Sequence, residues 1–194
     1  QDPRVLNKGI DKTNNGKFYY GYGAKAQNTL IPAFYAAYTG TNQSKVGLSA
    51  FKQLPLPNWN INYNGLSKIK ALSKIFSNIT LQHRYTGTYT LSGYTTNLYY
   101  NPNDTAKQGV DLVSKYNINS VSIREQFSPL IGIDITTKSG ITAGIKINRS
   151  RNVTLFVPNA NLTELTSKDF SLNMGYRTSG VKLPIKYNGK RIYL

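Results

Sequence analysis

The sequence predicts an all-β fold of antiparallel strands with one short amphipathic helix. Between Ile131 and Ile147, apolar and polar residues alternate on both sides of a tight turn at 138–140, as in a half-buried β-hairpin. The same period of two recurs at 59–63, 79–91 and 170–176. Residues 66–76 are the exception, because their apolar residues recur at helical spacing and do not alternate. These patterns predict a sheet with one apolar and one polar face.

The chain is expected to form a single partial domain in two parts. Residues 1–54 are rich in Gly, Asn, Tyr and Lys and are predicted to be mainly loop, with a short helix or buried turn at 31–40. The Ala-Ala pair favours helix there, and Pro32 suits a first turn. Residues 55–194 carry the strands and hairpins of a barrel wall.

Residues 66–76 are predicted to form the amphipathic helix. Leu66, Ile69, Leu72 and Ile75 fall on one face at helical spacing, and the lysines lie mostly elsewhere. Such a helix either lies at a membrane interface or packs on neighbouring strands with its lysines in solvent.

Two further features refine the strand pattern. Pro129 follows Ser128 within an otherwise regular strand, and its missing amide donor predicts a bulge or a strand break. Residues 182–193 predict a final hairpin that turns at Asn188 and Gly189. No strand follows to pair with it, so we expect this sequence to be part of a longer chain.

Composition narrows the classes of partner. The 194 residues contain 24 Lys plus Arg, 8 Asp plus Glu and no Cys, with a net charge of +16. A positive field of this kind attracts nucleic acid, an anionic membrane surface, phosphorylated glycolipid or acidic cargo. The lack of cysteine excludes disulfides, thiolate zinc sites and a cysteine nucleophile. No apolar run approaches the ~20 residues of a membrane-spanning helix.

The residues that usually carry catalysis are scarce. His83 is the only histidine, and it lies in phase with Ile79, Leu81 and Tyr85, so no Ser-His-Asp triad or histidine metal cluster is available. The eight carboxylates show no spacing typical of a general acid and base. We therefore expect no enzyme activity, no catalytic residues, no cofactor and no metal.

Three classes of function are compatible with these residues. The first is the wall of a membrane β-barrel, with an apolar face on lipid, a polar face on a watery lumen and tyrosines at the interfaces. The second is a basic β-domain that binds single-stranded nucleic acid or another polyanion, although its basic residues do not interleave with aromatics in one place. The third is a soluble β-sandwich adhesin or structural module. Periodicity does not separate the first from the third.

In the barrel interpretation, the alternation assigns residues to two faces. The predicted lipid-facing residues are Val121, Ile123, Ile131, Ile133, Ile135, Ile141, Ala143, Ile145, Ile147, Phe170, Leu172 and Met174. The predicted lumen-facing residues are Arg124, Asp134, Thr136, Thr142, Lys146, Asn148, Asn173 and Arg177.

Several long strings, in the same order, resemble the SprA (Sov) family, the giant outer-membrane translocons of the type IX secretion system of Bacteroidota. They are PLPNWNINYNGLSKI at 55–69, ITLQHRYTGTYTL at 79–91, SIREQFSPLIGIDITTKSGITAGIKINRSRN at 122–152, ANLTELTSKDFSLNMGYR at 160–177 and VKLPIK at 181–186. AFYAAYTG at 33–40 also fits. The resemblance runs from about Pro32 to the end of the sequence.

The resemblance implies an antiparallel transmembrane β-barrel segment, from the C-terminal part of a very large barrel in the bacterial outer membrane. It implies a channel that exports folded proteins whose C-terminal signal marks them as cargo. The implied partners are a barrel shuttle protein, a periplasmic plug protein, the rest of the same barrel, and outer-membrane lipid and lipopolysaccharide. Nucleic acid is not among them. The alternative is a complete small outer-membrane barrel of roughly eight strands.

Overall fold

The computed structural model describes residues 21–42, 45–47, 49–51, 56–102, 107–108, 111–178, 182–187 and 190–193. The loop-rich stretch expected at 1–20 and the predicted turn residues Asn188 and Gly189 lie outside these ranges.

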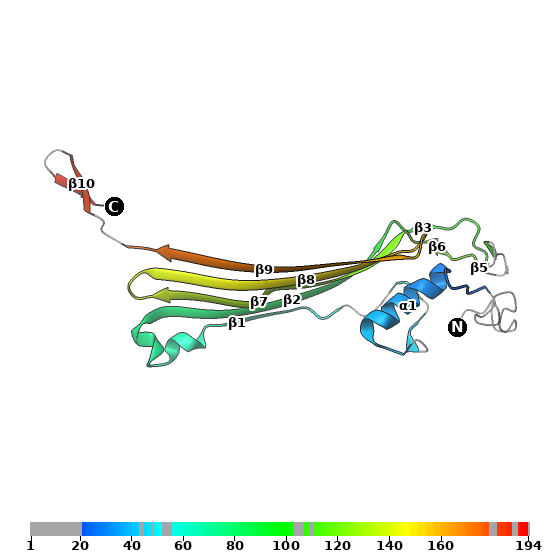
Figure 1. Ribbon diagram of the computed structural model, residues 1–194, viewed down its shortest axis with the longest axis horizontal. Coiled ribbons are helices and arrows are strands. Elements are labelled where there is room, and N and C mark those ends of the chain that lie inside the picture. Colours follow the sequence, from blue (N-terminus) through cyan, green and yellow to red (C-terminus); the bar gives the residue numbers. More distant parts are fainter. Residues whose placement is uncertain are drawn as a thin grey trace. The chain divides into compact units, whose positions relative to one another are not determined.

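A five-stranded sheet, largely of antiparallel strands, dominates the fold, in the order β1-β2-β7-β8-β9 (Figure 1). Its strands are β1 Trp59–Tyr63, β2 Phe76–Ser92, β7 Ser120–Thr137, β8 Ile141–Phe156 and β9 Asn161–Tyr176. The predicted all-β fold is confirmed at this level. Within the described residues the sheet is open, with β1 and β9 as its edge strands.

The chain divides into two compact units, and β2, β7, β8 and β9 each contribute to both. Unit 1 comprises residues 1–56, 87–124 and 152–165, and unit 2 comprises residues 57–86, 125–151 and 166–194.

Unit 1 has a hydrophobic core built around the helix α1 (Gln27–Thr39). The core side chains are Ile31, Phe34, Ile118, Val121, Ile123, Val153, Leu155 and Val157. The short helix predicted at 31–40 is therefore confirmed, but it begins four residues earlier, and Pro32 lies inside it rather than in its first turn. Gly40 ends the helix in the left-handed conformation, with φ 67°. Within the described ranges, α1 and the shorter helical turns fall short of the length and apolarity needed to cross a membrane.

The connections of unit 1 carry two further small sheets. β3 (Thr95–Thr96) pairs antiparallel with β6 (Tyr116–Asn117), and β4 (Lys107–Gln108) pairs antiparallel with β5 (Asp111–Leu112). These pairs tie together the long excursion that leads from β2 to β7.

The prediction of an amphipathic helix at 66–76 is wrong. The segment forms two short 3-10 turns, η3 (Gly65–Lys68) and η4 (Leu72–Lys74), and Phe76 already belongs to β2. Ile69 is extended between the turns, with φ −68° and ψ 124°. The Ile75 carbonyl accepts a hydrogen bond from Lys138 N at 3.0 Å, so the segment is held as a tight connection from β1 to its partner β2.

Strand β7 continues through Pro129, so the predicted strand break does not occur. The alternation of side chains keeps its phase across Pro129, because Phe127 packs on Tyr85 whereas Asp134, on the opposite face, bonds Gln82. The disturbance is local: a Cβ atom at Gly132 would lie 2.8 Å from Pro129 Cγ.

The two hairpins predicted from turn residues are both present. The turn between β7 and β8 closes with a hydrogen bond from Gly140 N to the Thr137 carbonyl, at 3.2 Å. At the other, β10 (Lys182–Tyr187) pairs antiparallel with β11 (Lys190–Tyr193), with Tyr187 opposite Lys190.

Replacing Gly140 by alanine is expected to destabilise the β7–β8 hairpin by about 1–3 kcal/mol. Gly140 has φ 92°, and an added Cβ would collide with the carbonyl oxygen of Arg177, just after β9. Denaturant titration of the purified protein measures the loss. Gly47→Ala is the matched control, because Gly47 has no positive φ and open space around its Cα. Equal stability of the two variants would contradict the expectation.

Candidate functional site

Unit 2 presents an exposed apolar surface, here called the apolar face. Its members more than one third exposed are Ile61, Tyr63, Ile131, Ile141, Ile145, Ile147, Phe170, Leu172, Met174 and Tyr176. The partly buried Ile133, Ile135 and Ala143 belong to it by phase. Exposed fractions reach 67% at Phe170 and 76% at Met174, far more than core side chains show.

Register places these side chains together. On β1 and β2, Ile61 lies opposite His83 and Tyr63 opposite Leu81. On β8 and β9, Arg177 N donates to the Gly140 carbonyl and Thr142 Oγ1 to the Gly175 carbonyl. This register puts each odd-numbered residue of β8 opposite an even-numbered residue of β9. Because successive side chains alternate between the faces, the odd positions of β8 and the even positions of β9 share one face.

The opposite side of unit 2, here called the polar face, is organised around Asp134. Its Oδ2 accepts a hydrogen bond from Gln82 Nε2 at 3.0 Å and lies 3.6 Å from Lys146 Nζ. Gly144 leaves room for this carboxylate, since a Cβ there would lie 2.5 Å from Asp134 Oδ1 and 4.0 Å from Asn173 Cβ. Polar contacts therefore link β2, β7 and β8 on this face, and Thr142 Oγ1 of β8 donates to the Gly175 carbonyl of β9.

The structure brings several of the predicted lumen-facing residues together. Asp134, Lys146, Thr142 and Asn173 surround Gly144 and Gly175 on the polar face. Thr136 and Asn148 follow in phase on β7 and β8. Arg124 instead belongs to unit 1, and Arg177 lies just beyond the end of β9.

The assignment of Val121 and Ile123 to a lipid-facing surface is wrong. Their exposed fractions are 0% and 1%, and both pack in the core of unit 1 with Ile31 and Phe34 of α1. The strand alternation is as predicted, but a helix covers this part of the strand. The other ten predicted residues lie in unit 2, outside that core.

An aromatic cluster occupies the first three strands of unit 2. The Trp59 ring stacks on Tyr85 with centroids 4.4 Å apart, and Phe127 lies 4.9 Å from Tyr85 and 5.8 Å from His83. Tyr85 Oη donates to Glu125 Oε1 at 3.0 Å. His83 Nδ1 lies 2.6 Å from the Leu130 carbonyl oxygen, so the only histidine has a structural partner next to Pro129 of β7. The alternation of the sequence places His83 and Tyr85 on one face of their strand, but it does not identify their partners on the neighbouring strands.

A row of basic residues continues the phase of the apolar face. Arg149 and Arg151 follow Ile145 and Ile147 at alternate positions of β8, and Lys168 precedes Phe170 at alternate positions of β9. Arg149 and Lys168 are exposed. The basic row was not among the predicted site residues, although its phase with the isoleucines identifies it in the sequence.

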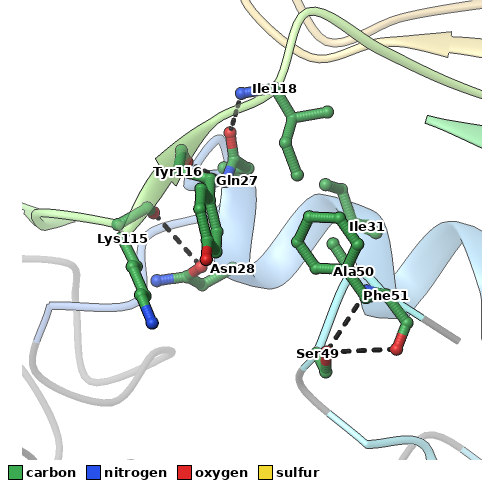
Figure 2. Close-up of a pocket in the computed structure, with 10 residues that line it drawn as sticks. Gln27, Asn28, Ile31, Ser49, Ala50, Phe51, Lys115, Tyr116 and Ile118 are labelled. Carbon is green, nitrogen blue, oxygen red and sulfur yellow. Dashed lines mark hydrogen bonds between the residues drawn. The ribbon is translucent and has the colours of Figure 1, made fainter. Parts of the chain in front are cut away.

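Unit 1 contains a pocket of about 220 Å³ beside α1 (Figure 2). Gln27 spans one wall, since its Nε2 donates to the Tyr116 carbonyl and its Oε1 accepts from Ile118 N, both at 2.8 Å. Asn28 Oδ1 accepts from Ser114 Oγ at 3.1 Å. These polar groups hold α1 against residues 114–118, which gives this pocket wall a structural role.

Tyr89 is an ionisable group of unit 1 whose pKa is shifted by its surroundings. Burial, followed by the neighbouring Tyr35, raises the pKa of Tyr89 to about 12. The phenol therefore stays neutral and donates to the Ala50 carbonyl at 2.8 Å. Among the residues that the structure describes, no group of three or more His, Asp or Glu side chains could hold a metal ion.

Unit 2 therefore has two different surfaces. The apolar face is exposed, and the polar face is hydrogen-bonded. No protein-family model matches this chain, and no curated protein matches it.

Proposed function

We propose that this chain is a wall segment of a giant outer-membrane β-barrel channel that exports folded proteins in type IX secretion. The observation that carries the proposal is the exposed apolar face of unit 2, backed by the Asp134–Lys146 polar face. The resemblance of the sequence to the SprA family supplies the secretion system.

The apolar face has the dimensions and chemistry of a lipid contact. Residues 141–147 cover about 20 Å of strand at a rise of about 3.3 Å per residue. They supply four outward apolar side chains in a row, close to the five that a barrel strand of about ten residues presents to lipid. The exposed members of the apolar face come from four strands, β1, β7, β8 and β9, and exposed apolar patches of large extent on a monomer usually mark an interaction site.

A soluble β-sandwich accounts less well for this surface. In a sandwich, a second sheet packs on the apolar face at about 10 Å and buries it. Within the described part of unit 2, Phe170, Leu172 and Met174 of β9 instead remain 54–76% exposed. Lipid chains would cover such residues from outside the protein.

The open sheet edges fit a larger wall. In a bilayer every backbone donor and acceptor needs a partner within the protein, so a lipid-facing sheet has to close. In the proposal, the rest of the same barrel pairs with β1 and β9, and the membrane-spanning segments are the parts of the strands in unit 2. In the alternative, the sheet closes as a complete small barrel of about eight strands.

The polar face would line the lumen along which cargo with a C-terminal signal passes. Asp134 and Lys146 neutralise each other, and Thr142 and Asn173 offer uncharged polar surface. Such a surface stays hydrated and adheres weakly to a passing folded protein. The barrel shuttle and plug partners belong to the proposal through the resemblance alone.

Single cysteines test the two faces directly, because the chain has none of its own. Ile145→Cys and Asn148→Cys, each labelled with an environment-sensitive fluorophore in the membrane-extracted protein, are placed in lipid nanodiscs. We expect lipid-soluble quenchers to reach the label at 145 and water-soluble quenchers the label at 148. The same quenching at both positions would overturn the wall assignment.

A photo-crosslinking residue tests the channel itself. Placed at Asn173 it would face the lumen, and placed at Leu172 it would face lipid. We expect secreted cargo to be captured from 173 and not from 172 in cells that are actively secreting. A protein with the expected quenching pattern that captures no cargo at 173 would be a membrane wall without the proposed transport role.

A further inference from the structure

The apolar face changes its chemistry in one direction along strands β2, β8 and β9 of unit 2. On β8 the isoleucines end at Ile147 and Arg149 follows; on β9, read backwards, Phe170 is followed by Lys168. On β2, Leu81 is followed by His83 and Tyr85. Because neighbouring strands are antiparallel, these changes gather at one end of the face, where Thr86, Glu125, Arg151 and Thr166 bound the unit.

Arg149 and Lys168 are cross-strand neighbours at this end. Strands β8 and β9 both have 16 residues, and the register that sets Thr142 opposite Gly175 also sets Phe156 opposite Asn161 at the other end. Neither strand therefore contains an extra residue, and the same register sets Arg149 opposite Lys168. Side chains of directly opposed residues lie about 5 Å apart at Cβ.

The pair places two positive charges side by side, and Arg151 follows Arg149 in the same phase. Glu125 of the neighbouring strand β7 accepts a hydrogen bond from the Tyr85 hydroxyl, and Glu164 lies four residues before Lys168 in the same phase of β9. Asp169 occupies the opposite phase of β9, within 3.4 Å of Ser167 Oγ. Two adjacent like charges repel each other, so an anion placed between them is favoured.

The neighbours of the pair determine what kind of anion fits. Ile147 and Phe170 lie next to Arg149 and Lys168 on the same face, and Phe170 is 67% exposed. Trp59, Tyr85 and Phe127 occupy the same end on the first three strands. Tryptophan, tyrosine and basic side chains collect where a bilayer meets water. An anion with an attached apolar chain satisfies both surfaces at once, whereas a free phosphate leaves the apolar part uncovered.

We propose that Arg149 and Lys168 bind the phosphate headgroup of an anionic membrane lipid whose acyl chains lie along Ile147 and Phe170. The inference rests on the proposed function, since it needs the apolar face to lie in a bilayer. It adds that this end of unit 2 is the membrane interface.

The test uses the whole membrane-extracted protein in nanodiscs that mix phosphatidylcholine with phosphatidylglycerol. Native mass spectrometry of the protein released from the discs counts the retained lipids of each kind. We expect phosphatidylglycerol to be enriched on the parent protein. The enrichment should fall about tenfold in the double variant Arg149→Gln, Lys168→Gln, because each basic residue near the membrane surface adds to the attraction.

The matched control is Arg84→Gln, Lys138→Gln, which removes the same charge from exposed positions outside the basic row. It should retain the enrichment. Equal loss of enrichment in both double variants would mean that net charge alone attracts the lipid, which contradicts a specific headgroup site. Absence of enrichment on the parent protein would also overturn the inference. Competition by inorganic phosphate, beyond that of sodium chloride at equal ionic strength, would indicate an ion site in place of a lipid site.

The two proposals fail in different ways. A protein that enters the discs, shows the quenching pattern of the two cysteines and retains no excess phosphatidylglycerol contradicts only the headgroup site. A protein that stays outside the discs contradicts the membrane wall and the headgroup site together.

Discussion

Replacing Ile145 by arginine is expected to prevent most of the protein from assembling in the outer membrane. Ile145 is 39% exposed at the centre of the apolar face and lies opposite Leu172 of β9 in the register of the two strands. A lipid-facing arginine near the bilayer midplane costs about 2–4 kcal/mol. In a soluble sheet, the same exposed position would accept arginine with little loss.

Asn148→Arg is the matched control, because it places the same side chain on the polar face of the same strand. Membrane fractionation followed by gel mobility with and without heating measures the folded, inserted fraction of each variant. We expect Asn148→Arg to insert as the parent does. Normal insertion of Ile145→Arg together with failure of Asn148→Arg would reverse the two faces.

Much of unit 2 could be predicted from the sequence because its pattern is local. Alternation alone gives the strands around Ile145 and Phe170, and the phase of Asp134 and Lys146 correctly places both on one face. Side chains two residues apart in a strand point the same way whatever the tertiary structure. The turn at Gly140 is likewise set by a residue that tolerates positive φ.

The remaining features depend on contacts between distant residues. Val121 and Ile131 are both apolar strand residues, yet one is fully buried and the other is 53% exposed, because α1 covers only the first. Alternation identifies a face but not what lies on it. The helical spacing at 66–76 gave a wrong prediction for a related reason, since this segment has to connect β1 to its antiparallel partner β2 and forms short turns there. The bond between His83 and Leu130 spans 47 residues and leaves no local trace.

Replacing Ile123 by alanine is expected to cost about 2–5 kcal/mol of folding free energy, because the substitution leaves a cavity in a packed core. Ile123 is 1% exposed and packs in the cluster that includes Ile31, Phe34 and Leu155. The loss should appear in unit 1, as faster hydrogen exchange of the backbone amides of α1.

The comparison with Ile131→Ala separates a protein core from a surface covered by lipid. Both substitutions remove the same atoms from the same strand, but Ile131 is 53% exposed and has few protein neighbours to lose. Denaturant titration in detergent should therefore show a loss below about 1 kcal/mol for Ile131→Ala. Equal large losses would mean that protein, and not lipid, covers the apolar face, and would favour a packed sandwich over a membrane wall. A small loss at Ile123 would instead mean that α1 is not held on the sheet by this core.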